Sequence, residues 1–494
     1  MPAHSRQKAH HLSSHAANLW NRRQMLARAG GGLGLLGLAS LLNDDGLLST
    51  ARAESAGAAL NPLAPKVAHF PAKAKSVIWL FINGGPSHVD TWDYKPELAK
   101  RDGQDLPGFD KFTGFFANAV GGLMKSPFEF RQHGESGKWV SDIFPNLSKH
   151  VDKMAFIHSG FTKSNNHSPA LFMMNTGFTQ MGHPCVGSWV TYGLGSESQD
   201  LPAYMVLTDP GGHPVDGVNN WSSGWMPPLF QGTVLRPTEP RILNLQPPAH
   251  LAGDVQRANL DLLRAFNERH LERHAGEADL EARIASYELA ARMQVAATEA
   301  LDVSKESAAT QRMYGLDQNE TREYGTRCLI ARRLVERGVR FVQLFLGGQP
   351  WDNHSDIRGG LSAVCRRTDQ PAAALVQDLK QRGLLDTTLV HWGGEIGRLP
   401  VTENHGDESK AGRDHNGQGF SCWLAGGGIR GGMTFGETDE FGHSAVVDRV
   451  TPNDIQATVL HQFGIEHERL EFEYNGRKQR LTDGRECRVL KELL

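Results

Sequence analysis

Short apolar runs recur along the chain, and longer segments of helical or loop character separate them. Each run is rich in Val, Ile, Leu, Phe or Trp and is followed by glycine or polar residues. This is the pattern of a strand that is buried on both faces of a parallel sheet. The runs lie at residues 76–82, 154–157, 202–207, 340–346, 387–392 and 422–425.

Two of the intervening segments have the apolar spacing of helices. Residues 320–337 form an amphipathic pattern that is followed by glycine, a common helix C-cap, and residues 372–383 form a second one. The second helix connects the strands predicted at 340–346 and 387–392, so the three segments make a right-handed βαβ unit. The chain is therefore predicted to be an α/β protein.

The rest of the chain fits one large domain, residues 54–494. A loop-rich insertion is expected at 208–250, where Pro, Gly, Asn and Trp accumulate, and polar surface helices at 255–306. Thr451 has the character of an N-cap, with proline in the first helical position, before a helix at 453–463.

Polar side chains able to bind a metal recur beside the apolar runs. In parallel sheets the carboxyl ends of the strands open on one crevice, so these side chains are expected to meet there. Carboxylate and imidazole groups are suitable ligands for Zn²⁺ or a similar divalent ion, with Ca²⁺ or Mg²⁺ as alternatives. Taken singly, each residue also fits an ordinary polar loop, but the recurrence favours a shared site. The candidate ligands are Asn83, Asp90, Asp352, His354, Glu395, Asp414 and His415.

Four further residues are candidates for catalysis. His167 and Ser168 precede an apolar helix, and a helix N-terminus attracts anions, so either could attack phosphorus or sulfur there. The alternative for Ser168 is a helix N-cap. Arg398 and Arg413 could each hold an anionic oxygen in bidentate fashion, or could pair with a nearby acid.

The N-terminus has the features of an export signal. Arg22 and Arg23 form a twin-arginine pattern, a mildly apolar stretch follows at 30–42, and an A-x-A cleavage site lies at 51–53. Residues 1–53 are therefore predicted to be a twin-arginine signal, which carries folded proteins to the periplasm or beyond. No later apolar run is long enough for a membrane span in the mature chain.

Charge and cysteine content narrow the functional classes. The formal net charge of -3 gives no reason to expect a nucleic-acid partner. The five cysteines are widely spaced and contain no CxxC pair, which argues against thiolate zinc sites and thioredoxin-like chemistry. Their odd number leaves at least one thiol unpaired within a monomer.

Several motifs together resemble one family. GGPSHVDTWD, CLIARRLVERGVRFVQL, WDNHSD, LLDTTLVHWGGEIGR and GRDHN with the following LAGGGIRGG and GETDE are similar to the bacterial secreted family called domain of unknown function 1501. That family is grouped with the alkaline phosphatase and sulfatase superfamily. The resemblance implies a large mixed, mostly parallel sheet sandwiched between helices, with a site for one or two metal ions.

The resemblance also implies roles for individual residues. Asp352 and His354 resemble a metal-binding pair, although their spacing is Asp-x-His rather than Asp-x-x-x-His, and His415 resembles the late histidine ligand. Glu395 stands where a metal-binding aspartate follows its strand, and Asn83 replaces the first-strand aspartate. Asp90 is the expected substitute for that ligand.

The segment HSPALFMMNTG is similar in length and in its Pro and Thr-Gly to the sulfatase nucleophile segment, and it places His167 at the nucleophile position. The cysteine and arginine of the sulfatase signature are absent. The leading hypothesis is a secreted metal-dependent hydrolase of phosphate or sulfate esters, acting on an anionic small molecule or polysaccharide. The alternative is a non-catalytic secreted scaffold or carbohydrate-binding protein that keeps the fold.

Overall fold

The computed structural model describes residues 62–494, apart from residues 244, 246–247, 249, 251–252, 275–277, 404–409 and 484. Asn61–Leu494 forms one compact unit. The predicted signal, residues 1–53, lies outside the described residues.

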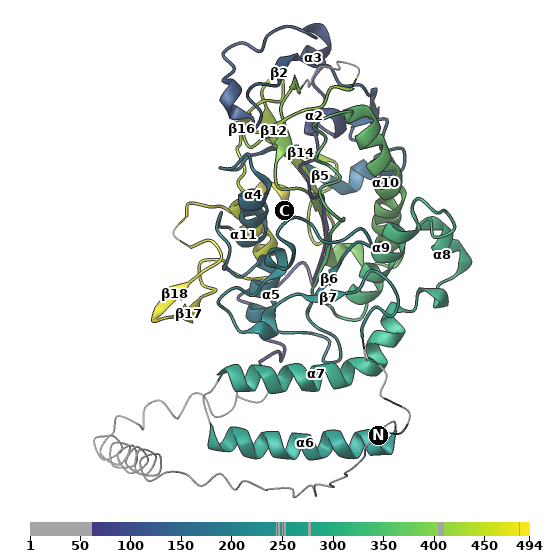
Figure 1. Ribbon diagram of the computed structural model, residues 1–494, viewed down its shortest axis with the longest axis vertical. Coiled ribbons are helices and arrows are strands. Elements are labelled where there is room, and N and C mark those ends of the chain that lie inside the picture. The colour runs from purple at the N-terminus through teal and green to yellow at the C-terminus, as the bar shows by residue number, and fades with distance from the viewer. Residues whose placement is uncertain are drawn as a thin grey trace, which may run out of the picture. The chain divides into compact units, whose positions relative to one another are not determined.

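A mixed, mostly parallel sheet of eight strands forms the centre of this unit (Figure 1). All six predicted apolar runs belong to it, and every strand except β13 runs in the same direction. The predicted fold class is confirmed. In spatial order the strands are β14 (Met433–Phe435), β5 (Met154–Gly160), β13 (Phe420–Ala425), β9 (Thr388–Gly393), β1 (Ser76–Phe81), β8 (Phe341–Leu344), β6 (Tyr204–Leu207) and β7 (Thr233–Leu235).

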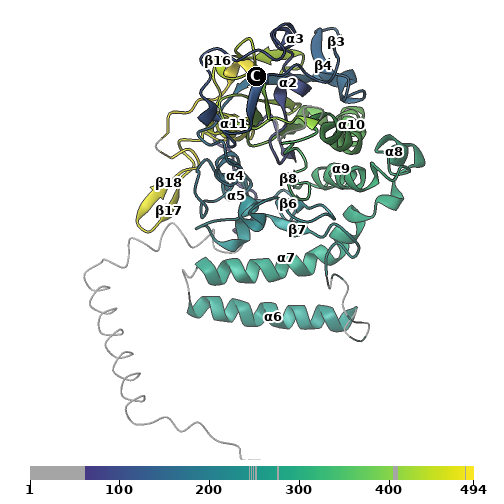
Figure 2. The same cartoon turned by 45° about the horizontal axis from the view of Figure 1, so that its top comes forward.

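Helices cover both faces of the sheet, as Figures 1 and 2 show together. Residues on β1, β9 and β13 are buried along their whole length because both faces are covered. One face carries α9 (Arg322–Val335) and α10 (Ile357–Gln381), and the other carries α4 (His167–Thr176), α5 (Val186–Leu194) and α11 (Pro452–Gln462).

Strand β13 runs antiparallel to both of its neighbours, β5 and β9. It therefore starts at the sheet edge where the parallel strands end. Asp414 and His415 reach that edge because they precede β13. The expectation that each predicted ligand follows a parallel strand is wrong for these two residues.

Two predicted boundaries also change. Helix α10 continues through Pro371 and begins at Ile357, well before the predicted start at residue 372, because its first turns bury Ile357, Leu361 and Val364. The loop region predicted at 208–250 contributes β7, a strand at the edge of the sheet.

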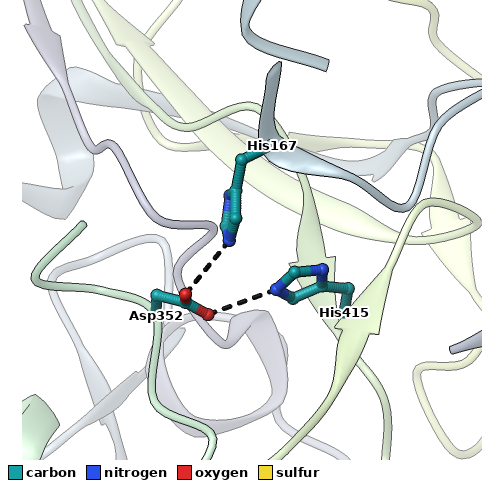
Figure 3. Close-up of side chains that lie close together, drawn as sticks. All are labelled: His167, Asp352 and His415. Atoms are coloured by element: carbon teal, nitrogen blue, oxygen red, sulfur yellow. Dashed lines mark hydrogen bonds and ion pairs between the residues drawn. The ribbon is translucent and has the colours of Figure 1, made fainter. Parts of the chain in front are cut away.

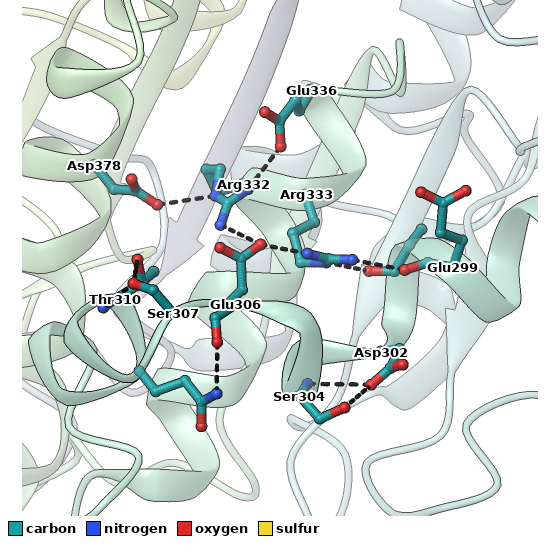
Figure 4. A network of polar contacts seen from close by, with 12 residues as sticks. Glu299, Asp302, Ser304, Glu306, Ser307, Thr310, Arg332, Arg333, Glu336 and Asp378 are labelled. Atoms are coloured by element: carbon teal, nitrogen blue, oxygen red, sulfur yellow. Dashed lines mark hydrogen bonds and ion pairs between the residues drawn. The ribbon is translucent and has the colours of Figure 1, made fainter.

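The predicted surface helices are α6 (Asp254–Arg273) and α7 (Ala278–Leu301). A buried ion-pair network links the segment after α7 to α9 and α10, the helices that pack on one face of the sheet (Figure 4). Arg332 on α9 lies 2.8 Å from Glu306 Oε1 and 2.9 Å from Asp378 Oδ2 on α10, and its side chain is only 1% exposed.

The remaining elements are short. The small antiparallel pairs are β2 (Val120–Leu123) with β11 (Val401–Glu403), β3 (Phe130–His133) with β4 (Lys138–Ser141), β10 (Gly397–Arg398) with β12 (His415–Asn416), β15 (Glu437–Thr438) with β16 (Ala445–Val447), and β17 (Phe472–Tyr474) with β18 (Arg477–Gln479). The short helices are α2 (His88–Thr91), α3 (Pro96–Lys100) and α8 (Ala308–Met313). Within the described ranges, no helix has the length and apolar character needed to cross a membrane. All five cysteines are free thiols.

Candidate metal centre

Three histidines and one aspartate meet at the carboxyl edge of the sheet, and three of the four are drawn in Figure 3. His167 is the first residue of α4, and His415 lies in β12, where it pairs with Arg398 of β10. Asp352 and His354 belong to the loop between β8 and α10. Segments far apart in the sequence therefore supply one cluster.

The ligand atoms have the spacing that a metal ion requires. Asp352 Oδ1 lies 2.8 Å from His354 Nε2 and 3.2 Å from His415 Nε2, and the two nitrogens are 2.9 Å apart. Ligands at 2.0–2.2 Å from one ion, at tetrahedral or octahedral angles, are separated by about 2.8–3.6 Å. His167 Nε2 lies 3.2 Å from the other oxygen of Asp352. His167, Asp352 and His415 thus form a second suitable group, with ligand atoms within 4.8 Å of one another.

The opposite ring nitrogen of each histidine contacts a hydrogen-bond acceptor. Nδ1 of His354 lies 2.5 Å from Glu403 Oε2, Nδ1 of His415 lies 2.7 Å from the Asn165 carbonyl oxygen, and Nδ1 of His167 lies 2.8 Å from Glu395 Oε1. Metal-binding histidines have this arrangement, because the outer N–H bond fixes the tautomer and directs the free nitrogen at the ion. The residues of the cluster therefore fit a divalent ion.

The charges around Asp352 stabilise its carboxylate. Burial opposes its ionisation, but hydrogen bonds from the three histidines and the charge of Arg398 lower its pKa far below the usual value. Arg398 Nη2 lies 2.5 Å from Asp352 Oδ1. Asp352 is thus an anionic centre at which imidazole nitrogens and a guanidinium converge.

The histidines respond differently to burial. For His354, burial is outweighed by hydrogen bonds to Asp352 and Glu403, which raise its pKa to about 9. Burial is likewise outweighed for His167, whose pKa is raised by its two carboxylate partners. The pKa of His415 is lowered because burial exceeds the effect of its bond to Asp352.

Glu395 lies behind the cluster and supports it. Its side chain is fully buried, and Oε1 accepts hydrogen bonds from the Gly84 N–H at 2.9 Å and from His167. The second oxygen, Oε2, has no hydrogen-bond partner among the described residues. Glu395 and Asp352 lie on opposite nitrogens of the His167 ring, so Glu395 supports that ring and belongs to neither group of possible ligand atoms. This corrects the assignment of Glu395 as a ligand.

Three other predicted residues have different partners. Asn83 ties β1 to the loop after β8, since its side chain bonds the backbone of Leu346 and Gly348. Both oxygens of Asp90 accept hydrogen bonds from Arg413, at 2.6 and 3.1 Å, and Arg413 is itself fully buried. These contacts correct the assignment of Asn83 and Asp90 as ligands and of Arg413 as a group that holds an anion.

Arg398 is also fully buried, and it donates to the backbone oxygens of Gly84 and Gly85 as well as to Asp352. Arg398 and Arg413 therefore each form an ion pair with an acid, which is the alternative to anion binding stated in the sequence analysis. Arg398 thus positions Asp352.

Asp414 forms another group of suitable spacing with His354 and His415, whereas Ser168 lies at the margin of the cluster. Asp414 Oδ1 accepts from the His415 N–H at 2.7 Å and lies 4.0 Å from His354 Nδ1, while Oδ2 accepts from the Phe116 N–H at 2.6 Å. Within the described ranges the Ser168 hydroxyl makes no hydrogen bond to the cluster residues, and the Ser168 N–H donates to the side chain of Asn166, the N-cap of α4.

Sequence reasoning missed the supporting residues of the cluster. Glu403 follows a short apolar stretch without any motif, so no sequence signal indicated it. Asn165 acts through its backbone carbonyl, which no side-chain pattern reveals. Phe115 and Phe116 come from a segment in which no element was predicted, and their rings lie 5.6 Å from His415 and 5.1 Å from His354.

Residues 74–494 match the family described as "Protein of unknown function (DUF1501)". No curated protein matches the chain in sequence. Several solved structures are similar to the chain at low sequence identity. The lipoteichoic acid synthase LtaP from Listeria monocytogenes is 9% identical, with a TM-score of 0.34 over 82% of this chain and 76% of the other.

The phosphonate monoester hydrolase SpPMH from Silicibacter pomeroyi is 10% identical, with a TM-score of 0.34 over 85% of this chain and 76% of the other. The PsFucS1 sulfatase from Pseudoalteromonas sp. is 11% identical, with a TM-score of 0.33 over 80% of this chain and 68% of the other. Likeness at this level transfers no activity to the chain.

Proposed function

For this chain, which belongs to the DUF1501 family of proteins of unknown function, we propose the activity of a metal-dependent hydrolase of phosphate or sulfate esters. One observation carries the proposal: three histidine Nε2 atoms face one carboxylate, Asp352, while the three Nδ1 atoms are held by acceptors. A set of nitrogen and oxygen donors with this support favours Zn²⁺ among common ions.

The bound ion would supply Lewis acidity, which polarises the ester and stabilises charge on the leaving group. Asp352, His354 and His415 would hold it, with His167 beside them. Arg398 keeps the Asp352 carboxylate ionised and in place. Glu403 and the Asn165 carbonyl fix the rings of His354 and His415, so that little reorganisation accompanies binding.

The cluster is open enough for an anion to reach it. The side chains of Asp352 and His354 are 22% and 23% exposed, whereas Glu395 and Arg398 behind them are fully buried. An anionic ester would therefore approach from the side of Asp352 and His354. Candidate substrates are phosphorylated or sulfated small molecules and polysaccharides.

The activity is tested with Zn²⁺-loaded protein and three chromogenic substrates: 4-nitrophenyl phosphate, bis(4-nitrophenyl) phosphate and 4-nitrophenyl sulfate. We expect turnover of at least one ester, and a loss of at least about 100-fold in Asp352→Asn because the anionic ligand is removed. Asp317→Asn, on the exposed surface, is the matched control and should retain activity. An inert wild type with its ion bound would contradict hydrolysis and favour the scaffold or carbohydrate-binding alternative.

We also propose that the protein is exported by the twin-arginine route to the periplasm or beyond. The motif at Arg22 and Arg23 and the A-x-A sequence at 51–53 support this. Replacing both arginines by lysine should leave the uncleaved precursor in the cytoplasm. Mature protein outside the cytoplasm in that variant would refute the assignment.

A further inference from the structure

Two exposed phenylalanines, Phe115 and Phe116, pack beside the cluster, and a third, Phe112, precedes them in the same segment. Phe112, Phe115 and Phe116 are 72%, 49% and 41% exposed, and all three lie within one short segment. Large apolar side chains are more often buried, so a local group of exposed ones indicates a surface that binds something.

The segment is fastened to residues that also hold His415. The Asn165 side chain donates to the carbonyl oxygens of Thr113 and Gly114 at 2.9 and 3.0 Å, and the Asn165 carbonyl is bonded by His415 Nδ1. Asp414, the neighbour of His415, accepts from the Phe116 N–H at 2.6 Å. The phenylalanines therefore have a fixed position relative to the cluster.

Glycine at position 114 makes this attachment feasible. A Cβ atom at Gly114 would lie 2.4 Å from Asp414 Oδ2, so a larger residue would displace either the segment or the Asp414 side chain. The close approach of the backbone to Asp414 places the two following phenyl rings next to the histidines.

The rings face the cluster on one side and solvent on the other. The Phe116 ring meets His354 edge-on at 5.1 Å, and the Phe115 ring is tilted against His415 at 5.6 Å. Phe112 packs on neither histidine and is the most exposed of the three. Covering the histidine rings therefore accounts for the inner sides of the Phe115 and Phe116 rings. It does not account for the exposed Phe112 side chain.

We propose that Phe112, Phe115 and Phe116 bind the non-reacting part of the substrate, and that this part is an aromatic ring attached to the anionic group. An aromatic ring gains from edge or offset contact with phenyl side chains while its anion reaches Asp352 and the histidines. The inference rests on the proposed function and adds to it that the substrate is an aryl ester.

The test compares two ligands that cannot be hydrolysed, so it does not depend on turnover. Phenylphosphonate and methylphosphonate are titrated calorimetrically into Zn²⁺-loaded protein. We expect phenylphosphonate to bind at least about five-fold more tightly, which is the gain typical of one aromatic contact. Equal affinity, or no binding of either ligand, would overturn the inference.

The variants separate the rings from the rest of the site. Phe112→Ser with Phe115→Ser should remove most of the preference for phenylphosphonate over methylphosphonate. Phe112→Ser alone should reduce the preference without any risk to folding, because its side chain is largely exposed. Trp139→Ser, which removes another exposed aromatic side chain, is the control and should keep the preference. A preference retained in the double variant would refute the role of the rings.

The result is distinguishable from that of the ester panel. Preferential binding of phenylphosphonate by a protein that hydrolyses none of the esters would leave the aromatic site standing and remove the hydrolase. Hydrolysis without any preference between the two phosphonates would support the hydrolase and rule out the aromatic site.

Discussion

Nε2 of His354 lies 2.9 Å from Nε2 of His415, although the two residues are 61 positions apart in the chain. Two imidazole nitrogens at this distance share either a proton or a cation. The outer nitrogens are bonded to Glu403 and to the Asn165 carbonyl, so neither ring can turn away without losing a hydrogen bond. The pair therefore has the geometry of a preformed half of the proposed metal site, which Asp352 would complete.

Removing the acceptor behind His354 should weaken metal binding. Glu403→Leu deprives His354 Nδ1 of its partner, and loss of such outer contacts typically costs about 10- to 100-fold in metal affinity. The dissociation constant for Zn²⁺ is measured by competition with a chromophoric chelator. Glu403→Gln, which can still accept a hydrogen bond, should retain most of the affinity. Unchanged affinity in Glu403→Leu would show that Glu403 has no part in the site.

Ser168 and His167 should differ in their importance for catalysis. The Ser168 hydroxyl makes no hydrogen bond to the cluster in the described part of the chain, whereas His167 lies between Glu395 and Asp352. We expect Ser168→Ala to retain kcat/KM within about three-fold, and His167→Ala to lose at least about 100-fold. Loss of turnover in Ser168→Ala with unchanged metal content would instead identify Ser168 as the nucleophile.

Buried His391 should make the protein less stable in acid. Its ring is 1% exposed and stacks on Trp79 at 4.6 Å, and burial lowers its pKa to about 3. The unfolded chain, with a pKa of about 6.5, binds the proton first, so stability is lost as the pH falls from about 6.5 towards 3.

At pH 5 this loss amounts to about 2 kcal/mol relative to neutral pH. In His391→Phe, the difference in unfolding free energy between pH 7 and pH 5, from urea titrations, should be smaller by that amount. His270→Phe, on the exposed surface of α6, should leave the difference unchanged. An unaltered difference in His391→Phe would mean that His391 is already charged in the folded protein at pH 5.

Truncation of Arg332 should destabilise the fold strongly. Its removal takes one cation from each of two largely buried acids, Asp378 and Glu306, which keep Arg382 and Arg333 as partners. Breaking a buried pair typically costs about 3–5 kcal/mol, so we expect a loss of about 3 kcal/mol, at the lower end of that range. Urea unfolding of Arg332→Leu measures the loss. Arg366→Leu removes an exposed pair with Glu320 and should cost about 1 kcal/mol or less. Similar values for the two variants would contradict a structural role for the network in Figure 4.

The sequence predicts the sheet well because its strands are continuous apolar runs with polar ends. The direction of β13 is not encoded in its composition, since an apolar strand reads the same in either direction. The convergence of Asp352, His354 and His415 could be anticipated, although the route of His415 to the site could not. The expected meeting point at the sheet edge is thus correct, although the parallel direction expected for the strand at 422–425 is wrong.

The sequence alone does not predict which groups the candidate residues contact. Asp90 and Arg413 are 323 positions apart, and their bidentate pairing removes both from the list of groups that could meet a metal or an anion. Asn83 has the position of a ligand but bonds the backbone of the neighbouring loop. Such choices depend on which atoms meet in three dimensions, and spacing along the chain carries no information about them.

Metal content tests the central claim most directly. Wild-type protein, His354→Ala with His415→Ala, and the control His69→Ala are equilibrated with Zn²⁺, passed into metal-free buffer and analysed by plasma mass spectrometry. The cluster predicts about one tightly bound ion per chain in the wild type and in the control, and almost none in the double variant. A wild type without zinc, or a double variant that binds as much as the wild type, would contradict the site and with it the proposed hydrolase.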